Sequence, residues 1–368
     1  MSTSDEPALA LGLMSGTSID GIDAALLWTD GESIAEPRGA LTVSYDDGMR
    51  SALREAIDQA EMMPNVTSVE RAMTLAHASA VSALLRQQDI EPEDVSVIGF
   101  HGQTLLHRPE EGVTWQIGDG SMLAVMTEID VVSDFRTADI EAGGEGAPLA
   151  PAYHAALALG LDKPLAVLNI GGVANVTWIG PDGSLIAFDT GPGNAMLDDW
   201  CNAHTGERYD EGGHIAASGQ ADTKSLEGLL DHPYFDRSPP KSLDRNNFSS
   251  EPIARMTVAD GAATLALFTV HAIVRAAHHF PQPVTRWLVT GGGRHNTVLM
   301  AWLAEHLTVP VDPVETVGWD GDAIEAQCFA YLAVRSLRGL PFTFPMTTRA
   351  PWPLTGGHFN PTFSNNKN

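Results

Sequence analysis

The chain has 368 residues, of which 43% are hydrophobic and 18% charged, and its formal net charge at pH 7 is −26. This composition is typical of a globular protein and excludes a disordered chain, and the length predicts two domains. The negative charge argues against binding to nucleic acid or to an anionic membrane, although a local site can still hold a phosphate ligand. An acidic surface that is adapted to high salt, or that merely keeps the protein soluble, would explain the same charge.

The two cysteines, Cys201 and Cys328, have no CxxC neighbour, so neither a zinc site nor a disulfide framework is expected. Residues 1–7 are acidic and polar, unlike a signal peptide. The most apolar helical stretch, 262–277, is expected to be too short and too polar to cross a bilayer. These features together predict a cytoplasmic enzyme.

Apolar runs and helical periodicity predict alternating strands and helices in the first half of the chain. The strands are expected at 8–13, 22–28, 40–45, 95–100, 113–117 and 131–133, and the helices at 46–61, 68–86, 121–127 and 151–159. The second half repeats this logic. Its strands are expected at 165–170, 173–179, 185–188 and 286–290, and its helices at 195–204, 257–280, 297–307 and 320–337.

The repetition predicts two related α/β domains. A glycine-rich loop at 143–148 marks the boundary, which gives a first domain at 1–140 and a second at 141–339. The tail, 340–368, has little periodicity and is rich in proline, threonine and glycine. It is either a surface strap that packs back on the first domain or partly disordered.

Three glycine-rich turns follow apolar strands, at 15–21, 189–194 and 291–296. Small residues let the backbone approach an anion closely, so the first two turns are candidates for holding phosphates and the third for lying against a flat base. An ordinary β-hairpin explains the first turn equally well. The sequence has neither a P-loop nor a dinucleotide-binding fingerprint, so both of these sites are disfavoured.

Several side chains have both a chemical and a structural interpretation. Asp189 follows a strand and precedes Gly-Pro-Gly, which suits a general base, although it can also cap the next helix. Asp20 is either a turn residue or a partner of magnesium through water. Glu325 is either a solvated acid on a helix or an acid pointing into a cleft, and His101 is either catalytic or a hydrogen-bonded structural histidine.

A set of motifs, in this order along the chain, resembles the anhydro-N-acetylmuramic acid kinase family. The motifs are Met-Ser-Gly-Thr-Ser-Ile-Asp-Gly at 14–21, His-Gly-Gln-Thr at 101–104, Gln-Ile-Gly-Asp at 116–119, Asp-Phe-Arg at 134–136, Gly-Ala-Pro-Leu at 146–149, Asn-Ile-Gly-Gly-Val-Ala-Asn at 169–175, Phe-Asp-Thr-Gly-Pro-Gly-Asn at 188–194 and Gly-Gly-Gly-Arg-His-Asn at 291–296. Each motif alone is unspecific, but the whole set is strongly specific.

The resemblance implies the two-domain α/β fold of actin-like, ribonuclease H-like ATPases, with an interdomain cleft and usually a homodimer. It implies ATP with Mg²⁺, and 1,6-anhydro-N-acetylmuramic acid from bacterial cell-wall turnover as substrate. The product would be N-acetylmuramic acid 6-phosphate. Position 145 is Glu where the family is expected to have Gln, which places an extra negative charge near the sugar, and the stretch 355–359 resembles the family's end only loosely.

The turns and the resemblance together predict the site residues. Catalysis is assigned to Asp189, which would take the proton of water, and more weakly to Glu325. Sugar binding is assigned to His101, Arg136, Gly146, Ala147 and Pro148. Nucleotide binding is assigned to Ser15, Gly16, Thr17, Ser18, Ile19, Asp20, Gly21, Ile22, Gly191, Gly291, Gly292, Gly293 and Asn296, with Asp20 also near the metal through water.

Two other functions remain open on the sequence. A kinase of the same superfamily could act on an ordinary hydroxyl of another sugar. A non-catalytic ATP-binding sensor or actin-like assembly protein would bind nucleotide without sugar-dependent turnover.

Overall fold

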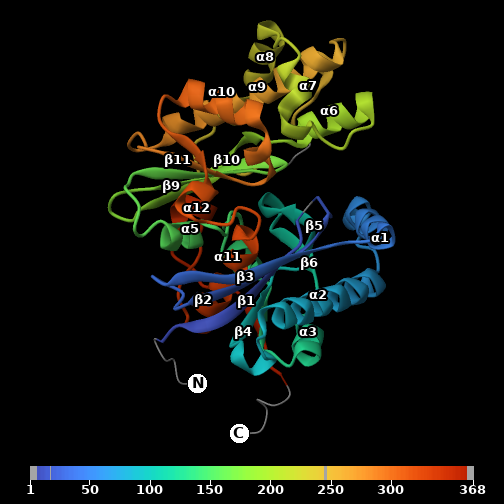
Figure 1. Ribbon diagram of the computed structural model, residues 1–368, viewed down its shortest axis with the longest axis vertical. Coiled ribbons are helices and arrows are strands. Elements are labelled where there is room, and N and C mark those ends of the chain that lie inside the picture. Colours follow the sequence, from blue (N-terminus) through green and yellow to red (C-terminus); the bar gives the residue numbers. More distant parts are fainter. Residues whose placement is uncertain (1–5, 17, 244–246, 363–368) are drawn as a thin grey trace. The chain divides into compact units, whose positions relative to one another are not determined.

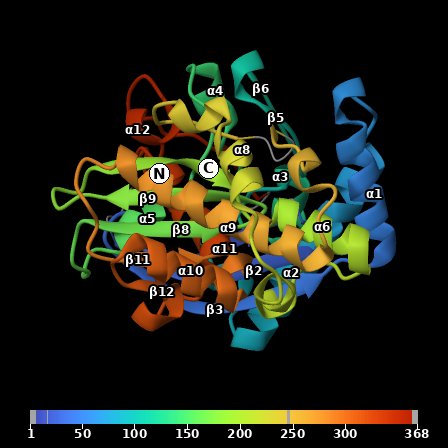
Figure 2. The same ribbon diagram turned by 90° about the horizontal axis from the view of Figure 1, so that it is seen from above.

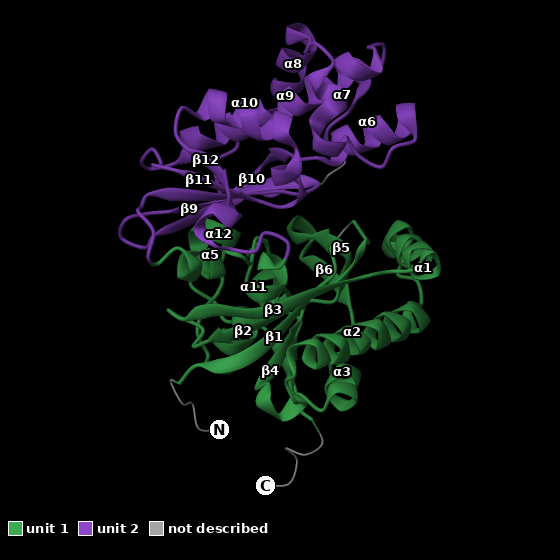
Figure 3. Cartoon of the chain, viewed as in Figure 1, with its two compact units in different colours: residues 1–159, 323–368 green, residues 160–322 purple. Residues whose placement is uncertain are grey.

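The computed structural model describes residues 6–16, 18–243 and 247–362. The chain forms two compact units, unit 1 from Met1–Leu159 with Ala323–Asn368 and unit 2 from Gly160–Asp322 (Figure 3). The chain therefore changes unit after Leu159 and again before Ala323, rather than at 140 and 339. The reason is that two helices placed by sequence in the second domain, α5 (Pro151–Leu157) and α11 (Ile324–Leu337), pack in unit 1.

Unit 1 is built on a six-stranded sheet with the order β13-β7-β4-β1-β2-β3 (Figure 1). Its strands are β1 (Ala8–Met14), β2 (Gly21–Thr29), β3 (Ala35–Ser44), β4 (Val97–Phe100), β7 (Val131–Ser133) and β13 (His358–Asn360). The first three form an antiparallel meander, whereas β4 runs parallel to β1 and β7 parallel to β4. A separate hairpin joins β5 (Gln103–Arg108) and β6 (Val113–Ile117).

Helices cover both faces of this sheet (Figure 1). The helices of unit 1, besides α5 and α11, are α1 (Asp47–Asp58), α2 (Thr67–Gln88), α3 (Gly120–Thr127), α4 (Thr137–Glu141) and α12 (Pro345–Thr348). Of these, α2, α3 and α11 contact the sheet directly. Leu11 and Leu13 point into a core with Met73 of α2, whereas Gly12 between them faces the backbone of α11. Because side chains alternate along a strand, α2 and α11 lie on opposite faces.

Unit 2 repeats this topology with the sheet order β10-β9-β8-β11-β12. The strands are β8 (Leu165–Ile170), β9 (Val173–Ile179), β10 (Leu185–Pro192), β11 (Trp287–Thr290) and β12 (Val311–Pro313). Again three consecutive strands are antiparallel, and two later strands extend the sheet in parallel from the first. The α/β class and the relationship between the two halves are thus confirmed.

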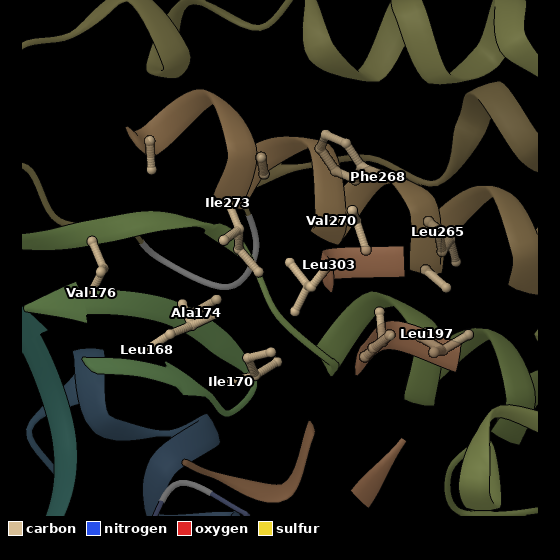
Figure 4. Close-up of a cluster of buried hydrophobic side chains, with 14 of the residues drawn as sticks. Leu168, Ile170, Ala174, Val176, Leu197, Leu265, Phe268, Val270, Ile273 and Leu303 are labelled. Carbon is tan, nitrogen blue, oxygen red and sulfur yellow. The ribbon is translucent and has the colours of Figure 1, made fainter. Parts of the chain in front are cut away.

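The helices of unit 2 are α6 (Ala195–Thr205), α7 (His214–Ala217), α8 (Thr223–Leu230), α9 (Val258–Ala276) and α10 (Thr297–Leu307). Figure 2 shows α9 in front of strand β8, and α10 contacts both α9 and β12. Buried side chains of α9, such as Leu265 and Phe268, share one cluster with Leu168 and Val176 of the sheet (Figure 4). Burial of this apolar surface stabilises the unit.

One helical stretch of the described residues, Val258–His279, is long and apolar enough to cross a membrane. This helical stretch is longer than the apolar segment 262–277 that was expected to be too short, because α9 has 19 residues and a 3₁₀ turn (Ala277–His279) follows it. Most of this stretch is buried in unit 2, which is the environment of a core helix.

Candidate active site

Side-chain hydrogen bonds from Gln103 and Tyr45 hold the turn between β1 and β2. Ser15 is 2% exposed, and its hydroxyl donates to Oε1 of Gln103 at 2.7 Å. The hydroxyl of Tyr45 donates to Ser15 Oγ at 3.0 Å, and Nε2 of Gln103 donates to the carbonyl oxygen of Gly16 at 3.3 Å. The proton of Ser15 is therefore committed within the protein, so this hydroxyl supports the turn instead of offering a donor to a ligand.

Further along the same turn, the side chains of Ile19 and Ile22 are buried in the core of unit 1. Ile19 is 3% exposed and has a φ of 57°, which is rare for a β-branched residue. In this conformation its N–H donates a hydrogen bond to the carbonyl oxygen of Gly16 at 3.1 Å. Ile22 is fully buried, whereas Ser18 and Asp20 are exposed. Thr17 lies outside the described residues. Any contact of Ile19 or Ile22 with a ligand would have to come from the backbone.

The buried His101 and the half-buried Arg136 form a pair in unit 1. Nδ1 of His101 lies 2.9 Å from the carbonyl oxygen of Gly102, and Nε2 accepts from the guanidinium of Arg136 at 2.9 and 3.2 Å. A guanidinium can only donate, so Nδ1 carries the proton. Burial and the charge of Arg136 hold the pKa of His101 well below its usual value, so the ring is neutral.

Arg136 links this pair to the glycine-rich loop. Its Nη1 donates to the carbonyl oxygen of Gly146 at 2.8 Å. Burial lowers the pKa of Arg136 to about 10, and the charge of Glu325 acts in the opposite direction. Glu325 is exposed in the first turn of α11, one turn before Phe329, whose ring stacks on His101 at 4.6 Å between centroids. The predicted sugar residues His101, Arg136 and Gly146 are thus brought together.

The tail also contacts this loop. Asp139 is 2% exposed, and its two oxygens accept from the N–H of Gly146 at 2.6 Å and from the hydroxyl of Thr348 at 2.7 Å. The N–H of Glu145 donates to the carbonyl of Thr348, and the Glu145 carboxylate pairs with Arg349 at 3.3 Å. The extra charge at position 145 is therefore matched by a cation of the tail. Ala147 and Pro148 follow, half-buried.

A pocket of about 240 Å³ opens beside His101 within unit 1. Gln116, Asp134 and Thr137 line it together with Gly102. Asp134 has a φ of 53°, and its Oδ1 accepts from the hydroxyl of Thr137 at 2.6 Å. Gln116 and Asp134 belong to the recognised motifs but were not among the predicted site residues, and only those motifs could have pointed to them.

In unit 2, Asp189 lies at an irregularity of strand β10. The register with β9 shifts between Asp189 and Gly191, and bulges of this kind re-aim a side chain next to many active sites. Asp189 is half-buried, and its Oδ2 accepts from the N–H of Leu243 at 2.8 Å. The strand continues to Pro192, beyond the expected end at 188, and Asn194 rather than Asp189 precedes α6. The helix-cap explanation of Asp189 is therefore wrong.

The third turn follows β11 and has one open glycine. A Cβ at Gly291 would lie 2.2 Å from Oδ1 of Asn169, and one at Gly293 would lie 2.4 Å from Ile170, whereas nothing lies within 4 Å of the same atom at Gly292. Oδ1 of Asn296 accepts from two N–H groups of α10 at 3.1 and 3.0 Å and so caps that helix. Gly292 is the position at which a ligand could approach the backbone.

Arg294 fastens this turn. It is 8% exposed, and its guanidinium contacts Glu315 at 2.8 Å, Asp322 at 2.8 Å and the carbonyl oxygen of Gly291 at 3.0 Å. Asp322 is the last residue before the chain returns to unit 1. The described residues contain no cluster of three or more His, Cys, Asp or Glu side chains suited to a metal ion.

Two units with the same sheet order, each with glycine-rich turns after its strands, define the class of ribonuclease H-like ATPases to which actin-like sugar kinases belong. Within that class the chain matches the family model described as anhydro-N-acetylmuramic acid kinase over residues 8–361, and it belongs to that family.

Similar proteins carry the same name along nearly their whole length. The anhydro-N-acetylmuramic acid kinase of Paramagnetospirillum magneticum is 56% identical over 95% of this chain and 98% of its own. That of Rhodospirillum rubrum is 54% identical over 97% of this chain and 96% of its own. A glucokinase structure from Streptomyces griseus is more distant, with 14% identity, a TM-score of 0.43, and coverage of 89% of this chain and 99% of that one.

Proposed function

We propose that this kinase uses ATP to convert 1,6-anhydro-N-acetylmuramic acid into N-acetylmuramic acid 6-phosphate and ADP, with Asp189 as the general base. The family match over nearly the whole chain supports the substrate. The observation that carries the assignment of the base is the half-buried carboxylate of Asp189 at a bulge in β10.

The chemistry explains why a base is required. The substrate has no free hydroxyl at O6, because O6 is bonded to C1 in the anhydro bridge. Water attacks C1 and the C1–O6 bond breaks. O6 forms a bond to the γ-phosphorus of ATP, and the bond between that phosphorus and the oxygen bridging it to the β-phosphate breaks, which releases ADP. The carboxylate of Asp189 takes the proton of the attacking water. The N–H of Leu243 on Oδ2 orients the carboxylate for this task.

Nucleotide binding is assigned to the first and third turns, together with Gly191 and Asn296. Backbone N–H groups between Ser15 and Ile22 would contact phosphate oxygens, since the side chains of Ser15, Ile19 and Ile22 are buried. The open backbone at Gly292 would lie against the base.

Mg²⁺ is expected with ATP, and the exposed carboxylate of Asp20 suits it through water. This ion keeps several waters and needs few protein ligands, so a larger acidic cluster is not required. When bound, it would offset charge on the transferring phosphoryl group.

Sugar binding is assigned to His101, Arg136 and the loop at Gly146, Ala147 and Pro148. The cationic Arg136 offers polar contacts to a carbohydrate that carries a carboxylate, and the neutral His101 holds its guanidinium from one side. The charge of Glu325 acts on Arg136 and raises its pKa. We also propose a cytoplasmic location, because the reaction consumes ATP, and a homodimer, which the family resemblance implies and sedimentation would test.

Product analysis in ¹⁸O-water tests the proposal. Mass spectrometry should find one label at C1 of a 6-phosphorylated sugar, and turnover should require the anhydro substrate. A phosphorylated sugar without label would show an ordinary kinase, and nucleotide binding without sugar-dependent turnover would show a sensor. Asp189→Asn should retain ATP binding and lose turnover, and full activity in this variant would refute the assignment of the base.

A further inference from the structure

One later segment of unit 2, residues 234–243, binds Asp189 on three sides. The N–H of Asp189 donates to the carbonyl oxygen of Lys241 at 2.9 Å, and the hydroxyl of Tyr234 donates to the carbonyl oxygen of Asp189 at 2.5 Å. The N–H of Leu243 donates to Oδ2 of the carboxylate at 2.8 Å. The bulge interrupts the regular pairing of β10 with β9 at this point, so these bonds replace part of the ladder.

The side chain of Lys241 binds the beginning of the same segment. It is 4% exposed, and its Nζ donates to the carbonyl oxygens of Tyr234 and Phe235 at 3.2 and 3.4 Å. These carbonyls lie near the C-terminal end of a 3₁₀ helix (Pro233–Asp236), where a cation is favourable. The same Nζ lies 4.7 Å from the ring centroid of Tyr234 and 5.9 Å from that of Phe188.

The hydrogen bonds connect Asp189, Tyr234 and Lys241 in a closed ring of contacts, which includes the backbone of the candidate base. Tyr234 and Lys241 each bind one backbone group of Asp189, and the ammonium of Lys241 binds Tyr234 from the other side. The two attachments therefore move together, and Leu243 follows Lys241 by two residues.

We propose that Lys241 is a positioning residue that holds the carboxylate of Asp189 in place through Tyr234 and Leu243. This rests on the proposed function, in which Asp189 is the base. A carboxylate that must take a proton from water during attack on C1 requires accurate placement, and small displacements of reacting groups cost large factors in rate.

The ammonium is held at the expense of stability. Among the described residues no carboxylate lies within 4 Å of its Nζ, and burial lowers the pKa of Lys241 to about 8. The charges of Arg237 and Arg275 lower the pKa further and that of Asp236 raises it, while His279 also faces the group. An apolar side chain of similar length would avoid this cost, so loss of the charge should separate stability from activity.

The test compares Lys241→Met, Lys241→Arg and Tyr234→Phe in the full-length protein, with Lys224→Met as a control because Lys224 is an exposed lysine of the same unit. For Lys241→Met we expect kcat to fall roughly ten- to a hundredfold while both KM values stay within about twofold. The melting temperature should stay the same or rise. Lys241→Arg should recover part of kcat, and Lys224→Met should match the wild type.

An unchanged kcat in Lys241→Met would overturn the proposal, as would a loss of kcat that follows a lower melting temperature. If this variant does not fold, Tyr234→Phe decides: it removes only the hydroxyl on the Asp189 carbonyl and should lower kcat without changing either KM. Asp189→Asn separates the two proposals. If that variant turns over normally, the base assignment fails; if it is inactive while Lys241→Met and Tyr234→Phe are normal, only the positioning role fails.

Discussion

Gly12 of β1 and Gly99 of β4 are register partners on neighbouring parallel strands, and helix α11 lies directly on both. A Cβ at Gly12 would lie 1.7 Å from the carbonyl oxygen of Ala326, and one at Gly99 would lie 2.0 Å from that of Phe329. The paired glycines let the helix backbone rest on the sheet. This close approach positions Glu325 and the Phe329 ring that stacks on His101.

We therefore expect Gly99→Ala to destabilise unit 1 by about 1–3 kcal/mol, because the methyl group would meet helix backbone that cannot rotate away. Urea unfolding measures this change. Gly228→Ala is the control, since Gly228 lies in α8 with nothing within 4 Å of the added atom, and should raise the free energy of unfolding by about 0.5–1 kcal/mol. Equal stability of Gly99→Ala and the wild type would contradict the close contact.

Local pattern predicted most of the two sheets, because apolar runs such as 8–13 and 165–170 are long enough to identify buried strands. It missed the short strands β12 and β13. It also missed β5, whose first residues were predicted only as polar groups at the end of the preceding strand. The unit boundary was also missed. An amphipathic helix carries no local sign of which sheet it covers, and α11 rejoins unit 1 only through long-range packing on Gly12 and Gly99.

The candidate site divides in the same way. Motifs identified His101, Arg136 and the loop at Gly146, and these side chains do lie together in unit 1. The supports of Asp189 could not be predicted, because Tyr234 and Leu243 are 45 and 54 residues away in sequence. The stretch 238–242, just before Leu243, is basic and proline-rich, but nothing in its local sequence indicates the strand end that it binds.

The pairing of Glu145 with Arg349 predicts a specific response to charge removal. Arg349→Ala would leave the Glu145 carboxylate, which is only 11% exposed, without this cation. We expect KM for the sugar to rise by about three- to tenfold, because the carboxylate can relax only by moving the loop that carries Gly146. Steady-state kinetics with saturating ATP measures the effect.

The double variant supplies the control. Glu145→Gln removes the negative charge while keeping the shape, so Glu145→Gln with Arg349→Ala should restore KM to within about twofold of the wild type. If the two changes simply add, the ion pair does not control the loop.

Buried neutral histidines predict loss of stability in mild acid. His77 is fully buried with Nδ1 on the carbonyl of Met73 at 2.9 Å, and burial lowers its pKa to about 4. The unfolded chain binds a proton near pH 6.5 and the folded chain does not, so stability present above pH 6.5 is lost as the pH falls toward 4. His107 and His154, whose pKa values are also lowered to about 4, add to the effect.

The free energy of unfolding should decrease less between pH 7 and pH 5 in His77→Leu than in the wild type, by on the order of 2 kcal/mol. Urea titrations at the two pH values measure it. His358→Leu makes the same substitution at an exposed position and serves as the control. A slope identical to that of the wild type in His77→Leu would show that this imidazole does not stay neutral.

Arg294 should govern the affinity for the nucleotide. Its guanidinium joins Glu315, Asp322 and the carbonyl oxygen of Gly291, and so fixes the turn with the open Gly292. Arg294→Met would leave two neighbouring carboxylates without their cation and release the Gly291 carbonyl. We expect Kd for ATP to rise about tenfold, which corresponds to one lost charge-assisted hydrogen bond. Isothermal titration calorimetry measures this constant directly.

Arg294→Lys keeps the charge but cannot make the forked contacts to Glu315 and Asp322, so it should also weaken ATP binding. Arg255→Met, at an exposed arginine of the same unit, should leave Kd unchanged. The sugar KM at saturating ATP should stay within about twofold in all three variants. An unchanged ATP Kd in Arg294→Met would show that the turn after β11 does not hold the nucleotide, since the cation that fixes the turn would then be dispensable for binding.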